Sequence, residues 1–107
     1  MAREERRGSQ RFNLSWPISV LCDEREVAKG KTSNISRGGA YFLGDPSIPL
    51  ETGMTVAVRI GVPGRGEAAA SMHTITGEAR VVRLKKGDAG CGIALHFAEG
   101  VDPFREP

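Results

Sequence analysis

Short stretches in which apolar and polar residues alternate run along most of this chain, separated by turns rich in glycine and proline. The clearest covers 54–60, where Met54, Val56, Val58 and Ile60 alternate with polar or small residues, the period of a strand with one buried face. Weaker extended patterns cover 13–22, 26–35, 40–43, 68–85 and 91–97. No long segment carries a helical stripe, so 98–104 is expected to form at most a short helical turn. The pattern predicts an all-β protein.

The connections between these stretches support a closed or nearly closed antiparallel barrel. Short strands joined by glycine-rich turns are typical of that architecture. The segment 61–67 holds three glycines and a proline, but it lacks the lysine and hydroxyl of a nucleotide triphosphate loop, so a plain hairpin loop is favoured. Residues 1–12 are polar and charged without hydrophobic periodicity, which predicts a flexible arginine-rich arm, with the β-barrel domain over 13–107.

The charge distribution favours a small anionic ligand over a nucleic-acid polymer. The 107-residue chain has a formal net charge of +2, and residues 1–12 hold four arginines against two glutamates, so basic and acidic residues balance in the remainder. A protein that grips long nucleic acid usually carries a basic face over its body as well. The chain has no apolar run near the ~20 residues that span a bilayer and no apolar secretory segment, so we expect a cytoplasmic protein.

The reactive side chains do not assemble into a catalytic or metal site. Cys22 and Cys91 are the only cysteines, too few for a disulfide framework and without a paired metal spacing. His73 and His96 lie in expected strands with neither a second ligand nor a nucleophile in the pattern. We therefore predict no catalytic residue, no metal, no cofactor and no enzymatic activity.

The stretch 34–43 carries the first half of a candidate binding site. On an extended strand Asn34 and Ser36 point to one face and Ile35 points to the other, which predicts an outward polar pair above an apolar core residue. Gly38 and Gly39 follow, where a side chain would block either a positive-φ turn or the close approach of another group to the backbone. The pattern predicts a hairpin whose mouth is a shelf for a flat polar ligand.

The second half lies in the arm, at Arg6, Arg7 and Arg11. Arg7 and Arg11 are separated by a segment containing Gly8 and Ser9, which favour irregular chain. Guanidinium groups fit phosphate or the O6/N7 edge of guanine and also stack on bases. Together with the polar shelf, they indicate a guanine-containing phosphodiester as ligand.

Arg7 and Arg11, followed by Asn34, Ser36 and Gly39, resemble the two-part signature Arg-x-x-x-Arg and Asn/Asp-x-Ser-x-x-Gly of PilZ domains. The likeness continues through 38–42, 77–83 and 92–97. The resemblance implies a six-stranded antiparallel split barrel and a receptor for the bacterial second messenger cyclic di-GMP. It also implies that Asn34 and Ser36 hold a guanine while the arm closes over the bases and phosphates, and that ordering of the arm signals to a downstream protein partner.

The resemblance further implies a role for Arg6, because an arginine directly before the signature is associated in this family with an intercalated pair of ligand molecules. Two alternatives stay open for the whole protein: a PilZ-type interaction adaptor without ligand binding, as in type IV pilus assembly, and a single-stranded nucleic-acid binder. For Asn34 and Ser36 the plainer role is turn capping, and for the arginines it is a solvated tail. Arg37 leaves the face of Asn34 and Ser36 and is expected to be a surface charge.

Overall fold

The computed structural model describes residues 10–64, 72–88 and 90–104. Within these ranges every regular element is a strand, as the hydrophobic alternation predicts. The strands are β1 (Pro17–Cys22), β2 (Arg25–Ile35), β3 (Gly39–Gly44), β4 (Thr55–Pro63), β5 (Met72–Gly87) and β6 (Gly90–Phe97). The expected strand over 68–85 thus begins at Met72 in the described chain, and 68–71 lie outside it.

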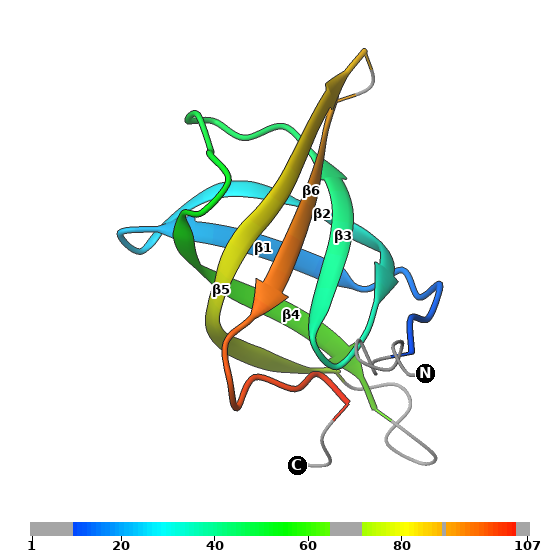
Figure 1. Ribbon diagram of the computed structural model, residues 1–107. Helices are drawn as coiled ribbons and strands as arrows, with labels where there is room; N and C mark the ends of the chain where they lie inside the picture. The colour runs from blue at the N-terminus through cyan, green and yellow to red at the C-terminus, as the bar shows by residue number, and fades with distance from the viewer. Residues whose placement is uncertain (1–9, 65–71, 89, 105–107) are drawn as a thin grey trace, which may run out of the picture.

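The strands form a closed barrel in the order β1-β2-β3-β6-β5-β4, with every neighbouring pair antiparallel (Figure 1). Closure comes from β1, which pairs with β2 on one side and with β4 on the other. A closed barrel leaves no full-length unpaired edge. The predicted six-stranded antiparallel barrel is confirmed.

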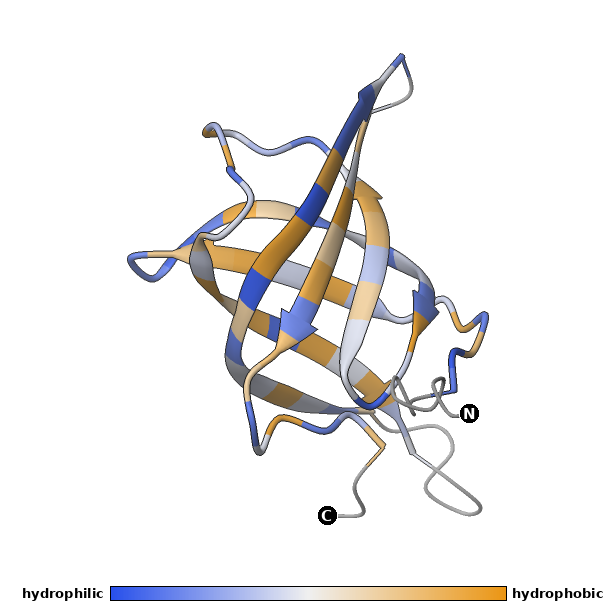
Figure 2. Cartoon of the chain, viewed as in Figure 1, coloured by the Kyte–Doolittle hydropathy of each residue, from blue (hydrophilic) through white to orange (hydrophobic). Residues whose placement is uncertain are grey.

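Alternate side chains of each strand fill the barrel. In β4, Val56, Val58, Ile60 and Val62 are buried while most of the residues between them are exposed, and Figure 2 shows the same alternation along the strands. Phe42 of β3 is the largest fully buried side chain. The period-two pattern of the sequence is therefore the pattern of burial.

One buried polar residue ties the start of β1 to β2. Pro17 has no N–H and is the first residue of β1, the position where a strand tolerates proline. Just before it, the Trp16 N–H donates to Thr32 Oγ1 at 2.9 Å, and the Thr32 hydroxyl donates to the Leu14 carbonyl. Thr32 is only 3% exposed, and its hydroxyl provides hydrogen-bond partners for two backbone groups that the strand pairing leaves free.

The segment after β6 runs back along the barrel without forming a helix in the described residues. The Ala98 N–H donates to the Glu78 carbonyl at 2.8 Å, and Pro103 is almost fully buried. Val101 packs on Gly77, and a Cβ added at Gly77 would lie 2.4 Å from the Cγ2 atom of Val101. Gly77 therefore makes room for the C-terminal segment to lie against β5.

Candidate ligand-binding site

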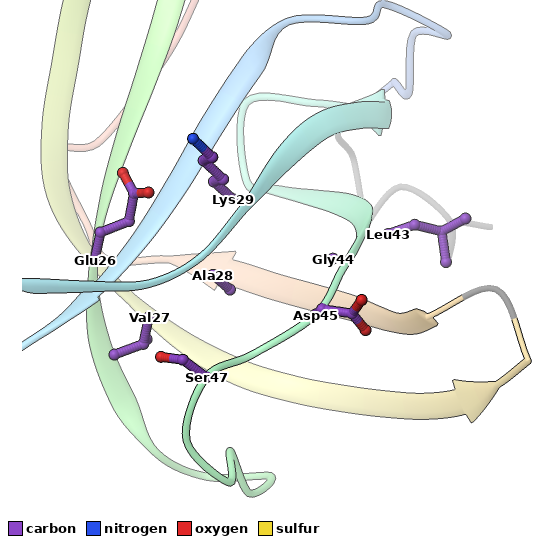
Figure 3. Close-up of a pocket in the computed structure, with 8 residues that line it drawn as sticks. All are labelled: Glu26, Val27, Ala28, Lys29, Leu43, Gly44, Asp45 and Ser47. Carbon is purple, nitrogen blue, oxygen red and sulfur yellow. The ribbon is translucent and has the colours of Figure 1, made fainter.

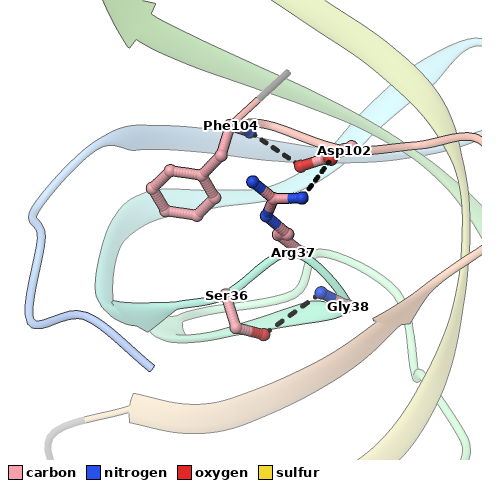
Figure 4. Close-up of polar contacts among 5 residues, drawn as sticks. All are labelled: Ser36, Arg37, Gly38, Asp102 and Phe104. Carbon is pink, nitrogen blue, oxygen red and sulfur yellow. Dashed lines mark hydrogen bonds and ion pairs between the residues drawn. The ribbon is translucent and has the colours of Figure 1, made fainter. Parts of the chain in front are cut away.

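The turn between β2 and β3 is held by its own hydrogen bonds. The Ser36 N–H donates to the Gly39 carbonyl at 2.8 Å, and the Gly38 N–H donates to Ser36 Oγ at 3.2 Å (Figure 4). The Ser36 hydroxyl in turn points to the Gly39 carbonyl at 3.4 Å. Ser36 thus acts as a side-chain cap of this turn.

The prediction that Asn34 and Ser36 form an outward polar pair is wrong for Ser36. Ser36 is only 4% exposed, whereas Asn34 is partly exposed and Ile35 is fully buried. The reason is that β2 ends at Ile35, so the alternation of the strand does not extend to the serine. The shelf at the barrel rim therefore presents Asn34, with Ser36 beneath it shaping the turn.

Gly39 is required by the neighbouring strand. A Cβ at this position would lie 2.2 Å from the carbonyl oxygen of Leu95 in β6, far inside any real Cβ contact. Gly39 is not among the residues with positive φ. Of the two explanations that the sequence left open, close approach of another group applies, and that group is the β6 backbone.

The arm enters the site at its last residues. Phe12 pairs with Ile35 in an isolated antiparallel bridge, with N–H to carbonyl distances of 2.8 and 2.9 Å in the two directions. This bridge brings Arg11 beside Asn34, and Arg11 Nη1 donates to Asn34 Oδ1 at 2.7 Å. The two halves of the signature, 23 residues apart in sequence, are thereby in direct contact at Arg11 and Asn34.

Arg7, the other arginine of the signature, and Arg6 directly before it lie outside the described residues. Arg11 itself is exposed, so most of its guanidinium faces solvent while one nitrogen is bonded to Asn34. Asn34 carries both an acceptor and an amide donor. The described part of the site therefore offers a cation and an amide side by side at the rim, a combination suited to a ligand with both phosphate and base edges.

The C-terminal segment also reaches this end of the barrel, which the sequence did not predict. The Phe104 ring centroid lies 5.2 Å from that of Phe12 and 5.3 Å from that of Trp16. Asp102 accepts a hydrogen bond from the Phe104 N–H at 2.9 Å and lies 3.8 Å from Arg37 Nη1 (Figure 4). The side chain of Arg37 is 71% exposed, as expected for a surface charge, so this ion pair contributes little stability.

Two cavities among the described residues lie away from the signature. One, of about 480 Å³, lies where β2 and the end of β3 diverge and is lined by Glu26, Val27, Ala28, Lys29, Leu43, Gly44, Asp45 and Ser47 (Figure 3). The other, of about 540 Å³, lies between the loop after β3 and the β5–β6 hairpin. Neither of these two cavities includes a residue of the signature.

Comparison with known families assigns nearly the whole chain to one family. A family model described as the PilZ domain matches residues 5–104, which is nearly the whole chain. The chain belongs to the PilZ domain family. PilZ domains are binding domains and not enzymes, and the match extends over the signature arginines as well as the barrel.

The fold of this PilZ domain also has a counterpart among solved structures. The structure of the Bacillus subtilis inhibitor of motility (MotI/DgrA) is similar with a TM-score of 0.71 and 19% sequence identity. The similarity covers 92% of this chain and 44% of that one, so the PilZ domain here spans less than half of the neighbour's length. At this identity the likeness shows a shared fold. Comparison with curated proteins gives no match.

Three further findings concern the described residues of this PilZ domain. Over the described ranges, no helix is long and apolar enough to cross a membrane. The same residues contain no cluster of three or more histidine, cysteine, aspartate or glutamate side chains suited to a metal ion. Cys91 is buried and Cys22 partly buried, and both are free thiols.

Proposed function

We propose that this PilZ domain is a receptor for cyclic di-GMP that binds the dinucleotide between the arm and the β2–β3 turn. In this mechanism Asn34 presents its amide to a guanine base, and Arg7 and Arg11 close over the bases and phosphates. Binding orders the arm, and the changed surface beside the barrel mouth is what a downstream protein partner recognises. The proposal places the receptor in the cytoplasm.

One observation carries the proposal: the hydrogen bond from Arg11 to Asn34 at 2.7 Å. It supports the proposal because Arg11, the last arginine of the arm, lies against the strand half of the signature, and the Phe12–Ile35 bridge fixes its direction of approach. A ligand inserted at this point meets a guanidinium and an amide together. The family match over 5–104 supports cyclic di-GMP as the ligand.

Ser36 and Gly39 contribute by fixing the shape of the turn from which Asn34 projects. The buried hydroxyl of Ser36 closes the turn, and the absence of a side chain at Gly39 lets it lie against β6. A direct contact between Ser36 and a guanine requires the hydroxyl to turn away from Gly39, where it makes only a long bond of 3.4 Å. Loss of either residue is therefore expected to weaken binding through the position of Asn34.

The expected affinity is the difference between the free energy gained from a few charged contacts and the conformational entropy lost when the arm becomes ordered. Each charge-assisted hydrogen bond contributes about 1.5–3 kcal/mol, whereas ordering the arm costs about 1–2 kcal/mol per residue. Four or five such contacts contribute about 6–15 kcal/mol, and ordering about four arm residues offsets about 4–8 kcal/mol of this. Only the upper part of the contact range leaves the roughly 8 kcal/mol of micromolar binding, so we expect affinity no tighter than micromolar to submicromolar.

The test is a calorimetric titration of cyclic di-GMP into the wild type and into Arg7→Ala, Arg11→Ala and Ser36→Ala. Saturable binding to the wild type should weaken by at least about tenfold in each arginine variant, since each loses one charge-assisted contact. Arg25→Ala, which removes an exposed arginine from β2, is the matched control and should bind as the wild type does. Absence of wild-type binding at concentrations of tens of micromolar or more contradicts the proposal and favours the ligand-free adaptor.

The same titration reports on Arg6. If Arg6 supports an intercalated pair of ligands, the wild type binds about two molecules per chain and Arg6→Ala about one, because the second molecule loses its cationic partner. A wild-type stoichiometry near one ligand per chain contradicts the intercalated pair while leaving the single-ligand receptor intact.

A further inference from the structure

The outer face of β3, β6 and β5 forms a continuous surface at the front of the barrel in Figure 1. Residues directly opposite each other on paired antiparallel strands point to the same side. Three rows cross this face: Gly39, His96 and Arg80; Tyr41, Ala94 and Arg83; and Leu43, Gly92 and Lys85. Each row ends in a cation on β5, so the cations form a column along that strand.

A bulge in β5 creates this column. The register between β5 and β6 shifts between Val81 and Arg83, so Val82 is the extra residue. The bulge reverses the alternation of the strand, and Val82 and Arg83 are therefore both exposed, while Val81 is fully buried. If β5 alternated regularly through Val82, Arg83 and Lys85 would point to the opposite face from Arg80.

Within the described chain, no ion pair neutralises this column. None of the residues in the three rows is acidic, and no described carboxylate lies within ion-pair distance of Arg80, Arg83 or Lys85. The one acidic residue of β5 is Glu78, which lies two positions before Arg80 on the same face, at one end of the column. Adjacent like charges repel one another, and an acidic partner would relieve that repulsion.

The same face carries exposed apolar side chains, Val82 next to Arg83 along β5 and Leu43 in the row that ends in Lys85. Leu43 is 49% exposed and Val82 is 43% exposed. In Figure 3 the Leu43 side chain points away from the other residues that line the cavity. Tyr41 covers Gly92, where a Cβ would lie 2.0 Å from the tyrosine hydroxyl, so the ring lies flat across the middle of the face. Tyrosine and arginine are enriched at protein interfaces.

We propose that this face, defined by Tyr41, Leu43, Val82, Arg83 and Lys85, docks an acidic segment of a partner protein that also carries apolar side chains. Its carboxylates pair with the column on β5, and its apolar side chains pack on Leu43 and Tyr41. The narrow column and its apolar flank favour a protein over a nucleic acid or an anionic membrane, which are bound by broader basic surfaces.

The docking face lies next to the candidate ligand site, although the proposal does not depend on ligand binding. The Phe97 N–H at the end of β6 donates to the Gly38 carbonyl in the β2–β3 turn at 2.8 Å. Gly39, the first residue of β3, directly follows that turn and begins the first of the three rows. A bound partner would therefore contact strands that also hold the signature turn in place.

The experiment measures binding of the full chain to a fluorescent acidic peptide in which glutamate alternates with leucine. Fluorescence anisotropy should show saturable binding that weakens with salt, because screening reduces attraction between exposed charges. The double variant Arg83→Glu/Lys85→Glu should lose at least about tenfold in affinity, since each former contact becomes repulsive. The control Lys29→Glu/Lys31→Glu has the same change in net charge on exposed positions of β2 and should bind as the wild type does.

A second pair of variants tests the apolar part of the face. Leu43→Ser should weaken the peptide, whereas Ile48→Ser, at a residue that is 39% exposed but outside the face, should not. Thermal unfolding of each variant shows that the barrel is intact. The proposal is overturned if the control reversal weakens binding as much as the β5 reversal does, or if a peptide with glutamine in place of glutamate binds equally well.

Three other probes separate the alternative occupants of the face. Stronger, β5-dependent binding to phosphatidylglycerol vesicles overturns the protein partner in favour of a membrane, and the same result with single-stranded DNA does so in favour of nucleic acid. Light scattering that reveals self-association abolished by Arg83→Glu/Lys85→Glu assigns the face to a second copy of the chain and likewise overturns the proposal. Binding restricted to the acidic peptide supports it.

Discussion

Substitution of Gly39 by alanine tests whether this residue belongs to the ligand site or to the barrel itself. The added Cβ would lie 2.2 Å from the Leu95 carbonyl oxygen, whereas real Cβ atoms essentially never approach another heavy atom closer than 3.0 Å. The atom it meets is backbone, so rotation of a side chain cannot relieve the contact. The β3 and β6 backbones must move apart at the pair Gly39 and His96.

The cost of that movement can be estimated from overpacking in well-packed structures. Forcing an extra carbon into a filled space costs about 1–3 kcal/mol. The stability of a domain of this size is about 5–15 kcal/mol, so Gly39→Ala should still fold. Each kcal/mol lowers the thermal midpoint by about 4–8 °C in a domain of this size. We therefore expect a clear fall in the midpoint in the absence of any ligand.

The assay is thermal or urea unfolding of the wild type, Gly39→Ala and a matched glycine variant. Gly87→Ala is the control because Gly87, like Gly39, lies at the end of a strand that pairs with β6. It has no positive φ, and its Cβ would meet only the Gly90 carbonyl at an ordinary 3.8 Å. Its stability should change by no more than about 0.5 kcal/mol. If Gly39→Ala unfolds at the same midpoint as Gly87→Ala, the close packing of the turn on β6 is refuted, and a purely ligand-facing role is restored.

Three other substitutions test neighbouring parts of the structure. Thr32→Val should lower the free energy of unfolding by about 1–3 kcal/mol in urea, because it leaves buried backbone groups without hydrogen-bond partners. The control Thr55→Val, at an exposed position, should not, and equal stability of the two variants would argue against the hydrogen bonds from Thr32 to Trp16 and Leu14. Phe104→Ala should shift the fluorescence of Trp16, the only tryptophan, to longer wavelength as water replaces the ring 5.3 Å away, and an unchanged spectrum would contradict that contact. Asn34→Asp should tighten cyclic di-GMP binding about fivefold in calorimetry, because a charged acceptor adds about 1 kcal/mol, and weaker binding would speak against a guanine at this position.

The barrel was readable from sequence because its core obeys a simple period. Alternation at Val56, Val58 and Ile60 is strong and local, and it specifies both the strand and its buried face. Glycine-rich turns then separate the strands. The pairings of β1 with β4 and of β3 with β6 join strands that are not consecutive in the chain, and the local pattern does not specify them. The described strand bounds were therefore predictable to within a few residues, and the predicted start at residue 68 lies outside the described chain.

The candidate site was predictable only where its geometry is local. The spacing of Arg11, Asn34 and Gly39 indicated the two halves, but strand parity misplaced Ser36 because it assumed that β2 continues past Ile35. The end of a strand depends on the hydrogen bonds of the following turn, and the alternation of apolar and polar residues does not indicate those hydrogen bonds.

Long-range contacts account for the rest of what the sequence did not reveal. Phe12, Trp16 and Phe104 meet although they lie at opposite ends of the chain, and nothing in their local patterns pairs them. The bulge at Val82, which turns Arg83 outward, is likewise a property of the β5–β6 register. Such features depend on which strands become neighbours, so they can be identified from the folded barrel but not from the local sequence pattern.

The most direct test of the central claim is a titration of the isotopically labelled protein with cyclic di-GMP, followed by amide chemical shifts. The account predicts that the largest changes occur at Arg11, Phe12 and the segment 34–39, where the arm and the β2–β3 turn meet. Residues around the cavity at Val27 and Ser47 should remain unchanged. Changes concentrated at that cavity, or none at Arg11 and Asn34 in a protein that binds the ligand, would contradict the account.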